Sequence, residues 1–127
     1  MIKFFKFIFH AMVLFLIVIS LYPGSVLGYF FYGNLYLQPN LINNPFGTTI
    51  NHFIYYFFVT FFGLCLHLRE TSFHKVFYGL LFLSVILEIL QQIVPHRAFQ
   101  LYDLLANFAG VLVAYFLVKI YLILNKP

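Results

Sequence analysis

Residues 76–94 read VFYGLLFLSVILEILQQIV, an apolar run that holds a single charged side chain, Glu88. A helix needs about 20 apolar residues to cross the hydrocarbon core of a bilayer, and this run has nearly that length. It begins after Lys75 and ends at Pro95, which cannot continue a helix. The run therefore predicts a membrane-spanning helix that carries a carboxyl group near one end.

Three further apolar runs of similar length surround it, over residues 4–22, 50–68 and 104–124. Hydrophobic residues make up 64% of the 127-residue chain and charged residues 8%, whereas a soluble domain has about 25% charged residues. Because so short a chain cannot bury this much apolar surface, the excess must face lipid. We expect an all-α integral membrane bundle of four transmembrane helices, forming one domain over residues 1–127.

The first run also allows a second interpretation. Lys3 and Lys6, the apolar run and the small residues that end at Gly28 resemble a secretory signal that is cleaved before Tyr29. The apolar run is longer than the core of such a signal, which has about 7–15 residues. We therefore favour an uncleaved membrane anchor.

The positions of the cations predict the orientation of the bundle, because lysine and arginine gather on the cytoplasmic side of a membrane. Lysines precede the first span and follow the fourth, and Arg69 and Lys75 lie between the second and third. The loop over residues 23–49 contains no charged residue, and the connection over residues 95–102 has one permanently charged cation, Arg97. Both termini are thus predicted to be cytoplasmic, and the long loop is predicted to face outward.

The outward loop is rich in aromatic residues. Those in its first half are Tyr29, Phe30, Phe31, Tyr32 and Tyr36. Aromatic rings favour the headgroup layer of a membrane, because there one side of the ring contacts hydrocarbon and the other contacts water. We favour a loop that lies on the membrane surface and is partly helical. The alternative is that these rings cover a lipid-binding groove.

Polar side chains gather near the outward ends of the last three spans. At about 100° per residue, Ser84, Glu88, Gln91 and Gln92 share one face of the third span. The corresponding face of the second span consists of His52, Tyr56, Val59 and Gly63. The corresponding face of the fourth span consists of Asp103, Asn107, Gly110 and Ala114. We predict that these three faces meet in a polar pocket that opens toward the outer leaflet.

Several of these residues also have structural interpretations. Asp103 is a candidate N-cap of the fourth helix, and Arg97 is a candidate salt-bridge partner for Asp103 or an interfacial anchor. Asn107 is a candidate for hydrogen bonding between helices, and His52 for packing at an interface. Glu88 is the hardest to explain structurally, because a carboxylate at that depth must be neutral, paired or hydrated.

The third and fourth spans resemble the C-terminal motif of the VanZ-like family of membrane proteins. The matching residues are Glu88-Ile-Leu-Gln91, Pro95-His-Arg97, Asp103-Leu-Leu-Ala-Asn107 and Gly110. Upstream, His52-Phe53 followed by Tyr56 is similar to the family's histidine motif. The family often has an Asp-Lys pair before this histidine, and Thr48 and Thr49 stand there instead. The resemblance implies a multi-pass protein of the bacterial cytoplasmic (inner) membrane, related to proteins of teicoplanin resistance in the cell envelope.

Three functional hypotheses follow. In the first, the pocket binds an amphiphile such as a lipid-linked wall precursor or a lipophilic glycopeptide. Arg97 then contacts phosphate or carboxylate, and the polar side chains at positions 52, 88, 91 and 107 hold the headgroup. In the second, an intramembrane enzyme uses His52 and Glu88 as base and acid, or holds a divalent metal with Asp103. In the third, Glu88 serves a small proton-coupled transporter. We rank them in this order.

Other partners and cofactors find little support in the sequence. The seven cations form no basic stripe, so nucleic-acid binding is not expected. A single cysteine, Cys65, permits no internal disulfide, and no cysteine and histidine spacing predicts a zinc site. We expect membrane lipid as a partner and no cofactor.

Overall fold

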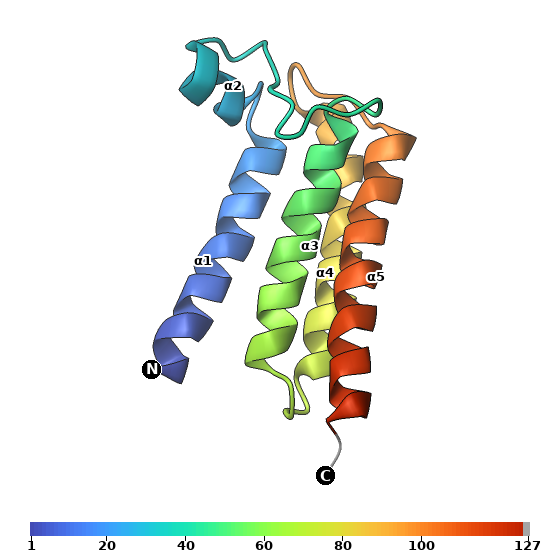
Figure 1. Ribbon diagram of the computed structural model, residues 1–127. Coiled ribbons are helices and arrows are strands. Elements are labelled where there is room, and N and C mark those ends of the chain that lie inside the picture. The colour runs from blue at the N-terminus through green and yellow to red at the C-terminus, as the bar shows by residue number, and fades with distance from the viewer. Residues whose placement is uncertain (126–127) are drawn as a thin grey trace.

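The computed structural model describes residues 1–125 and contains helices without strands in that part of the chain (Figure 1). The elements are α1 (Ile2–Leu21), α2 (Val26–Tyr32), α3 (Thr49–Leu66), α4 (Phe73–Leu90), the 3-10 turn η1 (Gln91–Ile93) and α5 (Leu101–Leu124). Among the described residues, α1, α3, α4 extended by η1, and α5 are long and apolar enough to cross a membrane. The predicted all-helical fold with four candidate spans is confirmed.

Proline decides where two of the long helices end. Tyr22 is extended because the next residue, Pro23, disfavours helical backbone before it, and α1 therefore ends at Leu21. In the same way Val94 is extended before Pro95. The helices α4 and α5 begin earlier than the apolar runs did, because their first turns include polar and aromatic residues that an apolar window excludes.

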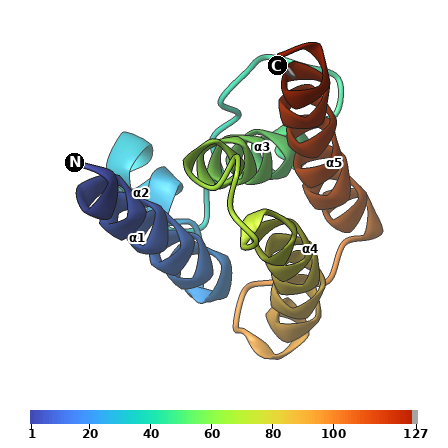
Figure 2. The ribbon, with the colours of Figure 1, turned by 90° about the horizontal axis from the view of Figure 1, so that it is seen from below.

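The helices pack around α3, which lies between α1 on one side and α5 on the other (Figure 2). Both chain ends lie at the same end of the bundle, which we call the terminal end, and the opposite end is the loop end (Figure 1). The closest packing joins α3 to α5. Gly110 makes it possible, since a Cβ there would lie 2.5 Å from the carbonyl oxygen of Phe53. Gly110 therefore allows the close approach of the α3 and α5 backbones, as expected from the small residues on that face of the fourth span.

The long loop crosses the loop end of the bundle and contains α2. Ser25 caps this helix by accepting a hydrogen bond from the Gly28 N–H at 2.9 Å, and Gly33 ends it in the left-handed region at φ 64°. Asn51 holds the loop in place, because its side chain donates to the Pro39 carbonyl at 2.8 Å and accepts from the Leu41 N–H at 3.1 Å. The partly helical loop is confirmed, and its aromatic side chains are exposed.

The interior changes character along the bundle. Toward the terminal end it is apolar, with buried residues that include Leu64, Phe77, Leu80, Val111 and Val118. Toward the loop end the buried side chains are polar, and they include Asn51, Ser84, Glu88, Asp103 and Asn107. The fold thus concentrates most of its buried polar groups at the loop end.

At the terminal end, an ion pair fastens α1 to the connection between α3 and α4. Lys6 Nζ donates to both carboxylate oxygens of Glu70, at 2.8 and 3.1 Å. The Ser72 hydroxyl donates to the same carboxylate at 2.8 Å. The bonds from Lys6, followed by that from Ser72, lower the pKa of Glu70 below its ordinary value.

Acid is expected to weaken this attachment of α1. Because the folded-state pKa of Glu70 is lowered, its stabilisation is complete above the unfolded pKa and is lost as pH falls through the folded pKa. The effect is small because the carboxylate is exposed. Melting temperatures in detergent should therefore fall further between about pH 5 and about pH 3 in the wild type than in Glu70→Gln. Parallel pH profiles for the two proteins would contradict this role.

Candidate functional site

A cluster of polar side chains joins α3 to α5 at the loop end. His52 Nε2 lies 3.4 Å from Asp103 Oδ2, and His52 Nδ1 lies 3.2 Å from Asn107 Oδ1. The Thr49 hydroxyl donates to Asp103 Oδ1 at 2.7 Å. We call these four residues the His52 cluster. Its bonds fix the plane of the imidazole ring, since both ring nitrogens face an oxygen atom.

Glu88 joins the end of α4 to the start of α5. Its carboxylate accepts a hydrogen bond from the backbone N–H of Gln100 at 3.0 Å, and its side chain is 1% exposed. One turn earlier on the same face, Ser84 is fully buried and donates to the Leu81 carbonyl. Glu88 is therefore a buried carboxylate that is partly satisfied by the backbone of a neighbouring element.

Arg97 and Gln91 bind the end of α1. Arg97 donates to the carbonyls of Ile19 at 3.0 Å and Tyr22 at 3.3 Å, and Gln91 donates to the Ser20 carbonyl at 3.1 Å. The last carbonyls of a helix have no partner within it, so these side chains cap α1. A guanidinium has five N–H donors, and the two bonds leave others available to a ligand.

The charge of Arg97 has no carboxylate partner. Among residues 1–125, no Asp or Glu oxygen lies within 4.0 Å of its guanidinium. Burial lowers the pKa of Arg97, although arginine remains charged at neutral pH. A half-buried cation that is bonded only to neutral carbonyls favours an anion beside it.

A cavity of about 40 Å³, which we call the arginine pocket, lies between α1, α3 and the loop end of α4. The polar residues that line it are Ser20, Ser25, Gln38, His52, Tyr55, Tyr56, Gln91 and Arg97. Of the six predicted site residues, the structure thus places three on this wall. The other three, Glu88, Asp103 and Asn107, lie behind it and bond to protein groups.

Two tyrosines of this wall carry buried hydroxyl groups without a hydrogen-bond partner among the described residues. They are Tyr55 and Tyr56, and the hydroxyl of Thr60 one turn further along α3 is in the same state. Buried polar groups are almost always hydrogen-bonded in proteins. The hydroxyls of Tyr55, Tyr56 and Thr60 therefore stand out as buried donors that the described residues leave unpaired.

Three structural interpretations drawn from the sequence are wrong. Gln100, not Asp103, is the N-cap of α5, because the helix begins before the apolar run and places Asp103 inside its first turn. Arg97 does not pair with Asp103, since its side chain reaches α1 instead. Gln92 is exposed rather than on the shared face, and it lies in η1, beyond the end of α4.

The metal-binding alternative finds no geometry in the described part of the chain. Residues 1–125 contain no group of three or more histidine, cysteine, aspartate or glutamate side chains placed to hold a metal ion. In particular, His52 and Asp103 are neighbours, while Glu88 is bonded to the backbone of Gln100.

The sequence did not point to every residue that builds the site. Thr49 bonds to Asp103 within the His52 cluster, and Asn51 bonds to the long loop. The end of α1 supplies three carbonyl groups to Gln91 and Arg97. The sequence could have indicated Asn51 as a structural residue, because an amide inside a membrane helix needs hydrogen-bond partners. It could not have indicated the carbonyls of α1, since their role depends on where α1 packs.

The fold and its polar end define the class: a multi-pass helical membrane protein with a polar pocket between its helices at one end. The chain belongs to the VanZ/LLP1 family, whose family model matches residues 5–123. This match confirms the resemblance seen in the motifs of the third and fourth spans. Comparisons with curated proteins and with solved structures gave no match.

Proposed function

We propose that the protein binds the anionic headgroup of an amphiphile in the outer leaflet of the bacterial cytoplasmic membrane. A lipid-linked cell-wall precursor is the leading candidate. One observation carries the proposal: Arg97 lines a pocket between the helices, half-buried and without a carboxylate partner among the described residues. Guanidinium groups bind phosphate through paired, charge-assisted hydrogen bonds, so this is the chemistry that Arg97 offers.

The other candidate residues take different roles around that contact. Gln91 shares the wall with Arg97 and offers hydrogen bonds to headgroup oxygens, and the ring of His52 lines the same wall. Asp103 and Asn107 orient His52, and Glu88 holds the start of α5 in place. Arg97 and Gln91 also cap α1, so a ligand that binds there would contact the side chains that hold the end of α1.

The proposed orientation places the pocket on the outer side. Arg97 is the only lysine or arginine between Lys75 and Lys119, whereas Lys3, Lys6 and Arg69 belong to the terminal end. This distribution favours a cytoplasmic terminal end.

Cysteine labelling tests this orientation. In a Cys65→Ser background, Asn43→Cys in the long loop should react in intact cells with a membrane-impermeant maleimide. Thr71→Cys in the connection between α3 and α4 should react only after lysis. Both positions are exposed, so burial does not distinguish them. The reverse pattern would place the pocket in the inner leaflet and contradict the proposal.

Photo-crosslinking in native membranes tests the binding itself. A photoactivatable polyprenyl diphosphate sugar should label the wild type, and Arg97→Ala should reduce labelling about tenfold, as expected for loss of a charge-assisted contact. Arg69→Ala is the matched control, because it removes the other arginine from the opposite end and should leave labelling unchanged. Labelling that Arg97→Ala does not reduce, or that Arg69→Ala reduces equally, would refute the proposal.

Antibiotic susceptibility is the expected cellular consequence. A protein that binds wall precursors, or a glycopeptide-type amphiphile in their place, alters how such drugs reach their target. We therefore expect a deletion strain to change its susceptibility to teicoplanin, and the wild-type gene but not Arg97→Ala to restore it.

One observation favours an enzyme as the second candidate. His52 lines the pocket with Asp103 Oδ2 at 3.4 Å from its Nε2, so its Nδ1 would act as a general base once a substrate displaced the Asn107 oxygen that faces it. Cleavage of a lipid-linked substrate that is lost in His52→Ala would support this function. Transport has no comparable support, because the interior beyond Ser84 and Thr60 is apolar around Leu64, Leu80 and Val111.

A further inference from the structure

Three cavities adjoin one another near the loop end of α1, and Arg97 lines two of them. The first is an apolar crevice of about 150 Å³ between α1 and α3. It shares Leu16, Ile19 and Tyr55 with the arginine pocket. The arginine pocket in turn shares Ser25, Gln38 and Arg97 with an outer cavity of about 100 Å³ beneath the long loop. The three form one track.

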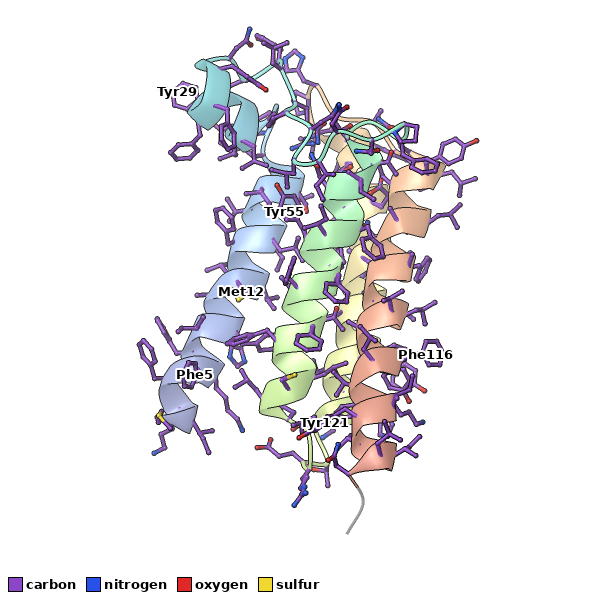
Figure 3. The ribbon with its side chains drawn as sticks, in the orientation of Figure 1. Phe5, Met12, Tyr29, Tyr55, Phe116 and Tyr121 are labelled. Carbon is purple, nitrogen blue, oxygen red and sulfur yellow. The ribbon has the colours of Figure 1, made fainter. Side chains whose placement is uncertain are left out.

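The walls of the track change from apolar to polar. The crevice is lined by Met12 and Phe15 from α1 and by Tyr55, Phe58 and Val59 from α3. Met12 and Tyr55 are labelled on these two helices in Figure 3. The outer cavity is lined by residues of the long loop and by His96 and Arg97. One of the loop residues is Tyr36, whose ring packs on His96 with centroids 5.2 Å apart.

We infer that this track binds a lipid phosphate that is substituted on both sides. One hydrocarbon chain lies in the crevice, the phosphate lies at Arg97, and a polar group beyond the phosphate occupies the outer cavity. The inference rests on the proposed function and deepens it, because it names the ligand class. That class is a phosphodiester or diphosphate lipid, as opposed to a lipid phosphomonoester.

The dimensions of the track support this class. A cavity of 150 Å³ between apolar side chains holds a molecule the size of benzene, so the crevice takes a chain segment of about six carbon atoms. The arginine pocket, at about 40 Å³, has room for about three water-sized groups and therefore for a phosphate but not for a sugar. Any sugar or glycerol must lie in the outer cavity.

The charge of the site points the same way. Arg97 is the single lysine or arginine at the loop end, so it neutralises one negative charge. Each phosphate of a phosphodiester, or of a diphosphate substituted on both sides, carries one such charge, whereas a phosphomonoester carries about 1.5 to 2 at neutral pH.

The crevice is also open to the bilayer. Phe15 on α1 is 57% exposed and Phe58 on α3 is 58% exposed, so the side of the crevice faces lipid. A lipid chain therefore reaches the crevice by lateral diffusion, and its headgroup stays at the level of Arg97. Loop residues above the pocket do not have to move.

The absence of tryptophan from the sequence allows a direct test. Phe58→Trp places one fluorophore in the crevice, and Phe82→Trp places one on the lipid-facing surface near the middle of α4. Each protein is reconstituted in phosphatidylcholine nanodiscs with increasing amounts of brominated phosphatidylglycerol, a diester, or brominated phosphatidic acid, a monoester. Bromine in the chain quenches tryptophan on contact.

In the Phe58→Trp protein, phosphatidylglycerol should quench the fluorescence at about threefold lower concentration than phosphatidic acid, because its glycerol adds hydrogen bonds in the outer cavity. Adding Arg97→Gln should abolish that preference, and the Phe82→Trp protein should respond equally to both lipids. Equal responses of the Phe58→Trp protein to the two lipids, or a preference for phosphatidic acid, would overturn the inference. If either result occurs while crosslinking of the polyprenyl diphosphate sugar still depends on Arg97, the proposed anion site stands and only the inference about the track fails. If the crosslinking does not depend on Arg97 either, the proposed function fails as well.

Discussion

Replacing Asp103 with alanine is expected to lower the free energy of unfolding by about 3 kcal/mol, the largest effect in the molecule. The carboxylate accepts the Thr49 hydroxyl at 2.7 Å and faces His52 at 3.4 Å. Its loss leaves the half-buried hydroxyl of Thr49 and a half-buried ring nitrogen of His52 without partners, and an unsatisfied group that is fully buried costs about 1–3 kcal/mol. Unfolding in mixed detergent and dodecyl sulfate micelles, followed by circular dichroism, measures the difference.

A conservative substitution and an exposed one serve as controls. Asp103→Asn keeps an oxygen that accepts from Thr49 and loses only the charge, so it should be less destabilising than Asp103→Ala. Glu70→Gln removes a carboxylate from an exposed ion pair at the other end of the bundle and should have a small effect. An Asp103→Ala protein as stable as Glu70→Gln would show that the His52 cluster does not hold α3 against α5.

The second large effect is expected at Gly110, where alanine should destabilise the bundle by about 1–3 kcal/mol. Its Cβ would lie 2.5 Å from the Phe53 carbonyl oxygen and 2.9 Å from the Phe57 nitrogen. Backbone atoms cannot rotate away as a side chain can, so α5 must move off α3. That movement also separates Asp103 and Asn107 from His52, which extends the damage to the pocket.

The same substitution at Gly79 is a matched control. A Cβ at Gly79 on α4 meets no atom within 4 Å, so Gly79→Ala should leave stability unchanged or raise it slightly. Both glycines lie in membrane-spanning helices, and only the packing differs. Equal melting temperatures for Gly110→Ala and Gly79→Ala would contradict the close approach of α3 and α5.

The helices and their polar faces were predictable from the sequence because each depends on local pattern. Apolar length predicts a span, and a period of 3.6 residues predicts which side chains share a face. On this basis His52, Asp103 and Asn107 were expected together, and the structure places them within hydrogen-bond range or close to it. Gly110 followed from the same reasoning.

Details that depend on packing between distant segments were not predictable. Arg97 reaches the carbonyls of Ile19 and Tyr22, more than 70 positions away, and nothing in the local sequence indicates that choice. The 3-10 turn that follows α4 and contains Gln92 also depends on how the chain approaches Pro95. For the same reason, the sequence did not indicate that the apolar helix α1 supplies backbone carbonyl groups to the site.

The central claim is that Arg97 binds a lipid anion, and the affinity of the purified protein for short-chain phosphatidylglycerol tests it most directly. Native mass spectrometry compares the wild type with Arg97→Gln, Arg97→Lys and Arg69→Gln. We expect affinity to fall about tenfold or more in Arg97→Gln, as for a lost charge-assisted contact. The fall should be smaller in Arg97→Lys, which keeps the charge but lacks the paired N–H donors of the guanidinium group. Arg69→Gln should bind like the wild type. Equal affinities for the wild type and Arg97→Gln would contradict the claim, and weaker binding by Arg69→Gln would then place the anion at the opposite end.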